Sequence, residues 1–358
     1  AKCMVVGSEE EGTAFGLTMP PHNWFQGYPT AVDRSGDSGS IGMLLFTSAW
    51  RPGESGVFFY GGSSKRFITL YYIGRGGQET YNRLTGFSRK TRYPQLLGHK
   101  VLSTHNHGTE RHIKKLERIG VNLALWTNYG HELSPERWQE QLSALLKLNS
   151  KNFRVIPSTE TSDASGPDGK YRGRLTNHMN YITPLPLLIR GAQRDAEGKY
   201  LPVSGEEGAE RRARIAVEAG GLAWLNHPAS EGIEHLVDNW TDDLFALEWN
   251  SLADIICSKS NNQFNPGLER PFFQRYEALL NAGRKIYIIA GTDDHSMTYI
   301  YNQGVVNYVH TESLEVANLI KALSNGDFFI STGEILIKDC YLDGARAGKD
   351  LRKGSRKK

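Results

Sequence analysis

Imidazole and carboxylate side chains follow several short apolar runs of this chain, at the points where the runs end. Nitrogen and carboxylate ligands together suit Zn, Mn or Fe better than Ca or Mg, which take mainly oxygen ligands. An ion of this kind lowers the pKa of its bound water to about 7 and so gives a hydroxide nucleophile at neutral pH. The pattern therefore predicts a metal-dependent hydrolytic site. Its candidate ligands are His105, His107, Glu160, His178, His227, Asp293 and His295.

The apolar runs before these residues predict buried strands, and the segments between them predict helices. From residue 99 onward the two patterns alternate, which is typical of βα units and of a parallel sheet or barrel. In such a barrel the carboxyl ends of the strands meet at one mouth, so residues far apart in the chain can form one site. Helices are expected over residues 111–119, 134–146, 206–219, 272–281 and 313–323, most of them followed by a glycine that can form a left-handed cap.

Two pairs of candidate ligands are separated by a single residue. Alternate side chains of a strand share a face, so His105 and His107 are expected to reach the same ion. Asp293 and His295 show the same spacing, and Gly291 before them permits a close backbone approach.

The remaining candidates come one at a time. Glu160 is a carboxylate that could bridge two ions about 3.5–4 Å apart. His178 lies in an alternating stretch over residues 175–182, which predicts a short strand. Pro228 is expected to hold His227 in an extended conformation.

Residues 1–98 differ from the rest of the chain in composition and in the pattern of their apolar residues. They are rich in glycine, serine, threonine and aromatic residues, and they lack a helical period. Apolar runs at 41–46, 56–60 and 66–73 are separated by turn residues, which predicts a small β-rich domain. We expect this domain to support the one over residues 99–358, which would carry the chemistry.

Composition excludes several classes of protein. The formal net charge of +3 over 358 residues is too small to indicate a nucleic-acid partner. No apolar run reaches the roughly 18 residues of a membrane span. The three cysteines have no CxxC spacing, so neither a zinc finger nor a disulfide framework is predicted. The expected partner is a small-molecule substrate; the oligomeric state is not indicated.

The chain begins at Ala1 without a methionine, which is compatible with removal of a signal peptide. A periplasmic or secreted location is therefore slightly favoured over a cytoplasmic one. Cysteine usage does not decide the compartment.

Five short motifs, in order, resemble those of the PHP (polymerase and histidinol phosphatase) superfamily, in its branch of carbaryl-hydrolase-like metallohydrolases. The resemblance implies a distorted (β/α)7 TIM-like barrel preceded by a β-rich domain. It also implies two or three divalent ions and hydrolysis of phosphoesters, or of related esters and carbamates. The motifs are Thr104–His107, Pro157–Glu160, Asn226–Pro228, Glu248–Asn250 and Gly291–His295.

One position departs from this family. Its usual Thr-Asp-His at the end of the second strand corresponds to Thr127, Asn128 and Tyr129 here. A neutral amide binds a hard cation less strongly than a carboxylate does. His131, two residues further on, is a candidate replacement ligand or general acid. Sites with two ions, one ion or no activity all stay open, so we expect on the order of one to three ions.

Arg174 is the candidate for binding an anionic group of the substrate, together with Lys170 and Arg172 in the loop before His178. A solvated loop is at least as compatible with these three residues.

Two other functions stay open. A binding protein without catalysis would agree with Asn128 and Tyr129. A metal-independent glycosidase would use two carboxylates, such as Glu160 and Glu248. A serine hydrolase is disfavoured because the sequence has no G-x-S-x-G elbow.

Overall fold

The computed structural model describes residues 3–8, 13–18, 70–74, 92–130, 133–161, 175, 178–191, 193–194, 200–201, 208–228, 232–249, 271–294, 305–331, 333, 336–342 and 345–346. All statements about the structure concern these residues.

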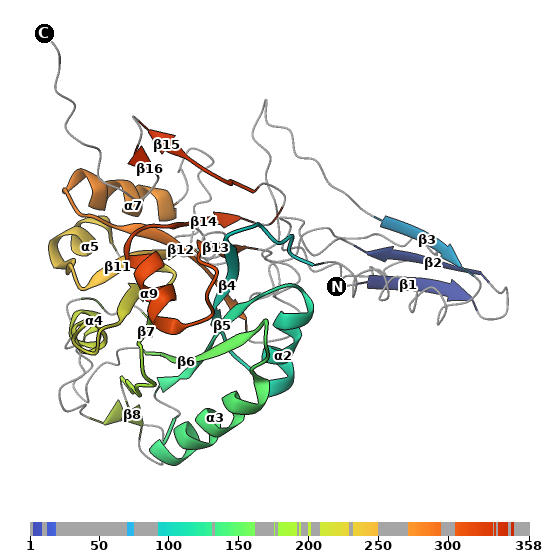
Figure 1. Ribbon diagram of the computed structural model, residues 1–358, viewed down its shortest axis with the longest axis horizontal. Coiled ribbons are helices and arrows are strands. Elements are labelled where there is room, and N and C mark those ends of the chain that lie inside the picture. The colour runs from blue at the N-terminus through green and yellow to red at the C-terminus, as the bar shows by residue number, and fades with distance from the viewer. Residues whose placement is uncertain are drawn as a thin grey trace, which may run out of the picture.

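Seven strands form a nearly closed, barrel-like sheet (Figure 1). Six of them run parallel to their neighbours, in the order β10–β11–β12–β4–β5–β6. The seventh, β7, pairs with β10 and meets the end of β6 through a single bridge between Thr161 and Met179. The strands are β4 (His99–Asn106), β5 (Leu123–Tyr129), β6 (Arg154–Glu160), β7 (Met179–Ile182), β10 (Leu222–Leu225), β11 (Leu244–Trp249) and β12 (Tyr287–Asp294).

The predicted parallel barrel is wrong in one strand, because β7 runs antiparallel to β10. β7 begins beside the end of β6, at the Thr161–Met179 bridge, and from there pairs back along β10 in the opposite direction. Two further antiparallel strands, β13 (Val306–His310) and β14 (Phe328–Ser331), extend the sheet from the first half of β4.

The helices confirm the predicted alternation and add one member. All five expected helices are present; α4 begins three residues and α9 three residues later than predicted. α5 was not predicted, because its seven residues are too few to show a clear period. The helices are α2 (Glu110–Arg118), α3 (Pro135–Leu148), α4 (Ala209–Glu218), α5 (Ile233–Asn239), α7 (Pro271–Asn281) and α9 (Val316–Ser324).

Local sequence explains where these helices begin and end. The Ser134 side chain accepts a hydrogen bond from the Arg137 backbone N–H, and a proline occupies the first position of α3. Gly120 and Gly220 follow α2 and α4 with φ of 92° and 78°, a backbone conformation that is strained for other residues.

The interior of the barrel is filled by apolar side chains. Ile156 of β6 and Ala246 of β11 belong to this interior cluster, and α9 packs against it. Because alternate residues of a strand share a face, Glu160 and Glu248 lie on the same inner face as these two residues, nearer the carboxyl ends. The barrel therefore places two fully buried carboxylates above an apolar core.

A separate antiparallel sheet is formed by β1 (Cys3–Ser8), β2 (Thr13–Thr18) and β3 (Leu70–Gly74). Of the predicted N-terminal strands, only the one over 66–73 overlaps a described strand; the runs at 41–46 and 56–60 lie outside the described residues. The division of the chain at residue 98 stays a prediction. Two short hairpins complete the description: β8 (Gln193–Arg194) with β9 (Tyr200–Leu201), and β15 (Tyr341–Leu342) with β16 (Ala345–Arg346).

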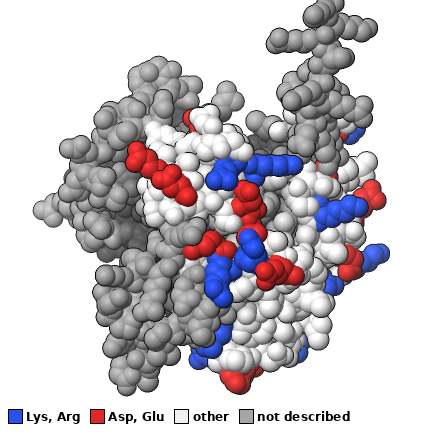
Figure 2. All heavy atoms as spheres, turned by 90° about the vertical axis from the view of Figure 1, so that its left-hand side faces the viewer, with Lys and Arg blue, Asp and Glu red and all other residues white. Residues whose placement is uncertain are grey.

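Within the described part of the chain, no helix has the length and apolar character needed to cross a bilayer. On the face seen in Figure 2, positive and negative side chains are interspersed among the described residues. One such pair joins Arg214 of α4 to Asp243, the residue before β11, with Nε 2.6 Å from Oδ2.

Candidate metal centre

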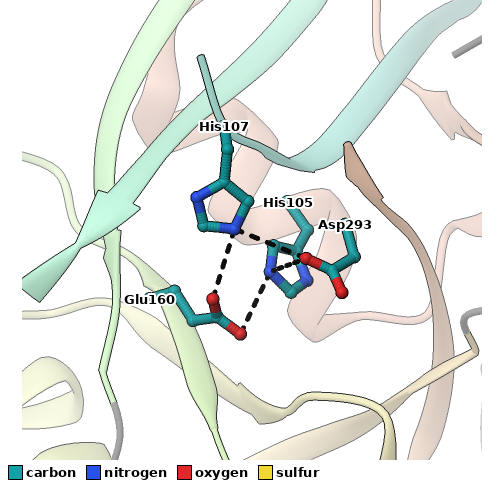
Figure 3. A group of neighbouring side chains, drawn as sticks. All are labelled: His105, His107, Glu160 and Asp293. Carbon is teal, nitrogen blue, oxygen red and sulfur yellow. Dashed lines mark ion pairs between the residues drawn. The ribbon is translucent and has the colours of Figure 1, made fainter. Parts of the chain in front are cut away.

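Six of the seven predicted ligands lie together at one mouth of the barrel, five of them at the carboxyl ends of parallel strands and His178 just before the antiparallel β7. They form two overlapping groups, and within each group the potential donor atoms lie within 4.8 Å of one another. The first group is His105, His107, Glu160 and Asp293 (Figure 3), and the second is Glu160, His178 and His227. His295, His131 and Arg174 lie outside the described residues, so their predicted roles stay predictions.

The first group is compact and largely buried. His105 Nε2 lies 3.2 Å from Glu160 Oε1, and His107 Nε2 lies 3.2 Å from Glu160 Oε2. Asp293 Oδ1 completes the group at 3.3 Å from His105 Nε2 and 3.5 Å from His107 Nε2 (Figure 3). Two imidazole nitrogens and two carboxylates therefore face one small volume.

The second group shares the carboxylate of Glu160 with the first. His178 Nδ1 lies 2.7 Å and His227 Nε2 3.3 Å from Glu160 Oε1. Asn226 Nδ2 also donates a hydrogen bond to this oxygen, at 3.1 Å. The His178 side chain is 38% exposed, whereas Glu160 is 1% exposed. Glu160 is thus a buried carboxylate shared by two groups, of which the second faces outward.

The backbone is strained at three of these residues. Among the described residues other than glycine, only His105, His227 and Asp293 have positive φ, with values of 57°, 25° and 47°. Such conformations cost about 1–3 kcal/mol each and gather at functional sites. All three belong to the two candidate groups, which sets this cluster apart from an ordinary buried polar network.

The expected convergence of His105 and His107 is present, but the predicted reason for it is incomplete. Val101 packs in an outer cluster and Leu102 in the interior, so strict alternation would turn His105 outward with Val101. Instead, the pairing of β4 with β5 shifts register between Ser103 and Asn106, and this irregularity contains the positive φ of His105. A β-bulge of this kind re-aims side chains beside active sites.

The expected extended conformation of His227 is wrong, since its φ is 25°. Pro228 disfavours the right-handed helical region for the residue before it, but it does not exclude positive φ. In this conformation the His227 ring lies beside the shared carboxylate of Glu160. It also meets the His178 ring edge to face, with ring centroids 5.0 Å apart.

Sequence reasoning missed the role of Glu248 in the site. Its carboxylate accepts from His105 Nδ1, at 2.8 and 3.0 Å, on the side of the ring opposite Glu160. Trp224 Nε1 donates to the same carboxylate at 3.3 Å. The signal was available, because Glu248 ends an apolar strand just as Glu160 does.

Of the two residues that depart from the family pattern, Asn128 bonds to α3 and Tyr129 packs against a ligand candidate. Asn128 Nδ2 donates to Gln141 Oε1 of α3 at 2.8 Å, and the Tyr129 ring lies against the His107 ring with centroids 4.6 Å apart. The imidazoles and carboxylates of the described residues thus provide two overlapping positions for an ion.

A cavity of about 530 Å³ adjoins His107, between the end of β5 and α3. Its inner wall is aromatic and amide in character, while Glu110, Arg137 and Glu140 at its edge are exposed. This volume is within the range of about 300–1,000 Å³ typical of small-molecule sites. The inner wall consists of Trp126, Asn128, Tyr129, Leu133, Gln141 and Ala144.

The charges of the site are strongly coupled. Burial alone would raise the pKa of Glu160, but the charges of His105 and His178 and hydrogen bonds from His105 and His107 hold it well below its usual range. Burial likewise opposes the charge of His105, but Glu248, Glu160 and Asp293 raise its pKa well above the ordinary value. Burial also opposes the charges of His107 and His227, but Asp293 and Glu160 raise the pKa of His107, and Glu160, Asp293 and Glu248 raise that of His227. The site therefore favours positive charge at its centre.

Without divalent ions, the protein is expected to lose stability as the pH rises above the ordinary histidine value of 6.5. The raised pKa values of His105, His107 and His227 contribute stability that is complete below the unfolded pKa and is lost as the pH rises through the folded pKa. The melting temperature of chelator-treated protein, measured from about pH 6 to 9, checks this expectation.

The matched variants for this pH series are His105→Gln and His235→Gln. His235 is exposed on α5 and belongs to neither candidate group, so its variant should keep the wild-type slope, whereas His105→Gln should flatten it. A melting temperature that rises over this range would contradict the pKa directions given above.

The donor set fits a divalent ion. Imidazole nitrogens and carboxylate oxygens within one buried volume are ligands of Zn, Mn and Fe. The group of His105, His107, Glu160 and Asp293 can therefore hold a metal ion, whose identity the geometry leaves open.

Comparison with protein-family models and with curated proteins found no match for this chain. The case for its function therefore depends on the geometry of the metal centre.

Proposed function

We propose that this chain is a divalent-metal-dependent hydrolase, which acts on a phosphoester or on a related ester or carbamate through metal-activated water. The observation that carries the proposal is Glu160, a buried carboxylate shared by two groups of potential ligands. A carboxylate in this position can hold two ions about 3.5–4 Å apart, as in many phosphatases and nucleases. The resemblance of the motifs to those of PHP proteins supports the same class.

The buried and the exposed residues of the site would have different roles. His105, His107 and Glu160 are buried and would fix the ligand geometry. Asp293, with 26% of its side chain exposed, and His178 are more open, so the substrate would approach on their side. When bound, the ions would supply Lewis acidity and a water of lowered pKa. His131 remains the proposed general acid, and Arg174 the proposed contact for an anionic group.

The cavity beside His107 is the proposed site of the group that leaves on hydrolysis. Its inner wall offers aromatic surface from Trp126 and Tyr129 and the polar amides of Asn128 and Gln141. Its described charges are one arginine and two glutamates, so it would disfavour a strongly anionic group. The scissile bond would lie at the metal site and an uncharged portion of the substrate in this cavity.

Filling the cavity is expected to weaken substrate binding without removing metal. Ala144 is buried on the cavity wall, so Ala144→Leu should raise KM by about tenfold, equivalent to about 1.4 kcal/mol of lost binding. The metal content of the purified variant should equal that of the wild type. Steady-state kinetics and elemental analysis measure the two quantities.

Ser143→Leu is the matched control, since Ser143 is the exposed neighbour on the same helix and does not line the cavity. An unchanged KM in Ala144→Leu, with the protein folded, would exclude the cavity from substrate binding.

The proposed reaction is tested with a panel of phosphomonoesters, phosphodiesters and aryl esters. Chelator-treated protein is assayed alone and after addition of Mn²⁺ or Zn²⁺. The proposal expects turnover that requires the added ion and that is lost in His107→Ala. Turnover of no member of the panel, by protein shown to contain metal, would instead favour a binding protein without catalysis.

The replacement of an acid and a histidine by Asn128 and Tyr129 is what favours that second candidate, because a neutral amide binds a hard cation less strongly than a carboxylate does. The glycosidase reading has less support. The His105 ring lies between Glu160 and Glu248, bonded to the second and 3.2 Å from the first, so an imidazole occupies the place of a sugar between these two carboxylates.

A further inference from the structure

We propose that Glu248 is a positioning residue of the metal centre, which holds the His105 ring so that Nε2 faces Glu160 and Asp293. Glu248 is not among the predicted ligands, and its carboxylate contacts His105 on the side away from the two ligand groups. The inference rests on the proposed metal binding and does not depend on which bond is hydrolysed.

The contact between the two residues is short and fully enclosed. Both oxygens of Glu248 lie near His105 Nδ1, at 2.8 and 3.0 Å, and both side chains are 0% exposed. A carboxylate only accepts hydrogen bonds when ionised, so Nδ1 donates. In the neutral imidazole the other nitrogen, Nε2, then carries the lone pair that a metal requires.

Glu248 is itself held in place from two further directions. Trp224 Nε1 donates to Oε2 at 3.3 Å. On another side the carboxylate lies against the backbone of Gly291, where an added Cβ would overlap its carboxyl carbon. The absence of a side chain at Gly291 thus makes room for Glu248, which gives the predicted close approach at this glycine a specific purpose.

His105 has particular need of such an anchor. It lies at a register shift of β4 with a φ of 57°, so the regular pleat of the strand does not direct its ring. A carboxylate bonded to the far nitrogen of a ligating histidine fixes both its orientation and its tautomer. Glu248 therefore fixes the orientation of the His105 ring, which on a regular strand the pleat would determine.

The test compares Zn²⁺ affinity of the full chain, measured by competition with a chromophoric chelator, in the wild type and in Glu248→Gln. Loss of such an outer partner costs about 10–100-fold in metal affinity, and this is the expected loss. Gly291→Ala should weaken Zn²⁺ binding in the same direction, because it displaces the carboxylate without removing it. Glu234→Gln, an exposed carboxylate on α5, is the matched control and should bind Zn²⁺ as the wild type does.

A second readout separates positioning from mere structural support. The visible spectrum of bound Co²⁺ should change in Glu248→Gln, since the ligand field depends on the orientation of His105. Circular dichroism confirms that each variant is folded before its affinity is compared.

The outcomes are distinct. Wild-type affinity and an unchanged Co²⁺ spectrum in folded Glu248→Gln would overturn the positioning role alone and leave the proposed hydrolase standing. Failure of the wild-type chain itself to bind Zn²⁺, Co²⁺ or Mn²⁺ would overturn both. Weakened binding in Glu248→Gln, with no turnover by the metal-loaded wild type, would support the positioning role and defeat the hydrolase.

Discussion

Replacement of Glu160 by glutamine is expected to remove divalent-metal binding and to lower turnover by at least about 10³-fold, because a single lost electrostatic contact at an active site already costs about 10²–10³. Glu160 is the one residue shared by both candidate groups, and it faces four imidazoles at 2.7 to 3.3 Å. Glutamine keeps the shape of the side chain but loses its charge, so the second ion position loses its only carboxylate and the first keeps only Asp293. Elemental analysis of the purified variant and its kcat/KM measure the two effects.

Glu117→Gln is the control for this substitution. Glu117 forms an exposed ion pair with Lys114 at 2.7 Å, and surface pairs of this kind contribute about 0–1 kcal/mol. Its loss should leave metal content and turnover unchanged. Full metal content in Glu160→Gln would show that the ions bind at another place in the protein.

Removal of the ions by a chelator is expected to lower the melting temperature by about 8 °C or more. A ligand present at about 1,000 times its Kd stabilises the fold by about 4.1 kcal/mol per site, and each kcal/mol shifts the melting temperature of a large domain by about 2 °C. Removal of the ion from the first group leaves two imidazoles and two carboxylates close together without the cation that they would bind. Differential scanning calorimetry with and without added Zn²⁺ measures the shift.

Asp293→Asn separates the two positions, because Asp293 belongs to the first group only. In this variant the Zn²⁺-dependent shift should fall to about half, since one of two sites of similar affinity is lost. A shift equal to that of the wild type would show that Asp293 does not ligate. The exposed His235→Gln should keep the full shift.

Much of the barrel could be predicted because its strands and helices carry strong local signals. α3 is the clearest case: Ser134 and Pro135 mark its beginning, and its apolar positions recur at helical spacing. β7 could not be oriented in the same way. Four residues that are buried on both sides show no direction, and pairing with β10 decides it.

The ligand groups could be foreseen in composition but not in geometry. That His105, Glu160 and His227 end buried strands is visible in the sequence, and the barrel then brings them together. The register shift that turns His105 inward depends on contacts between β4 and its neighbours, which no local pattern encodes. Glu248 likewise ends an apolar strand in the sequence, but its contact with His105 depends on the same arrangement of strands.

The departure at Asn128 shows the reverse situation. The sequence identified the change from an acid to an amide but could not say where the amide would turn. Its hydrogen bond to Gln141 depends on how α3 packs against the sheet. Local sequence patterns predict each of these elements but not the packing between them.

The most direct measurement is anomalous diffraction from crystals grown with Zn²⁺ or Mn²⁺ and recorded on both sides of the metal absorption edge. The proposed site predicts a peak about 2.0–2.2 Å from His105 Nε2, His107 Nε2 and oxygens of Glu160 and Asp293, with a second peak toward His178 and His227. A peak at another place, or His107 and Asp293 turned to separate regions of the molecule, would contradict it.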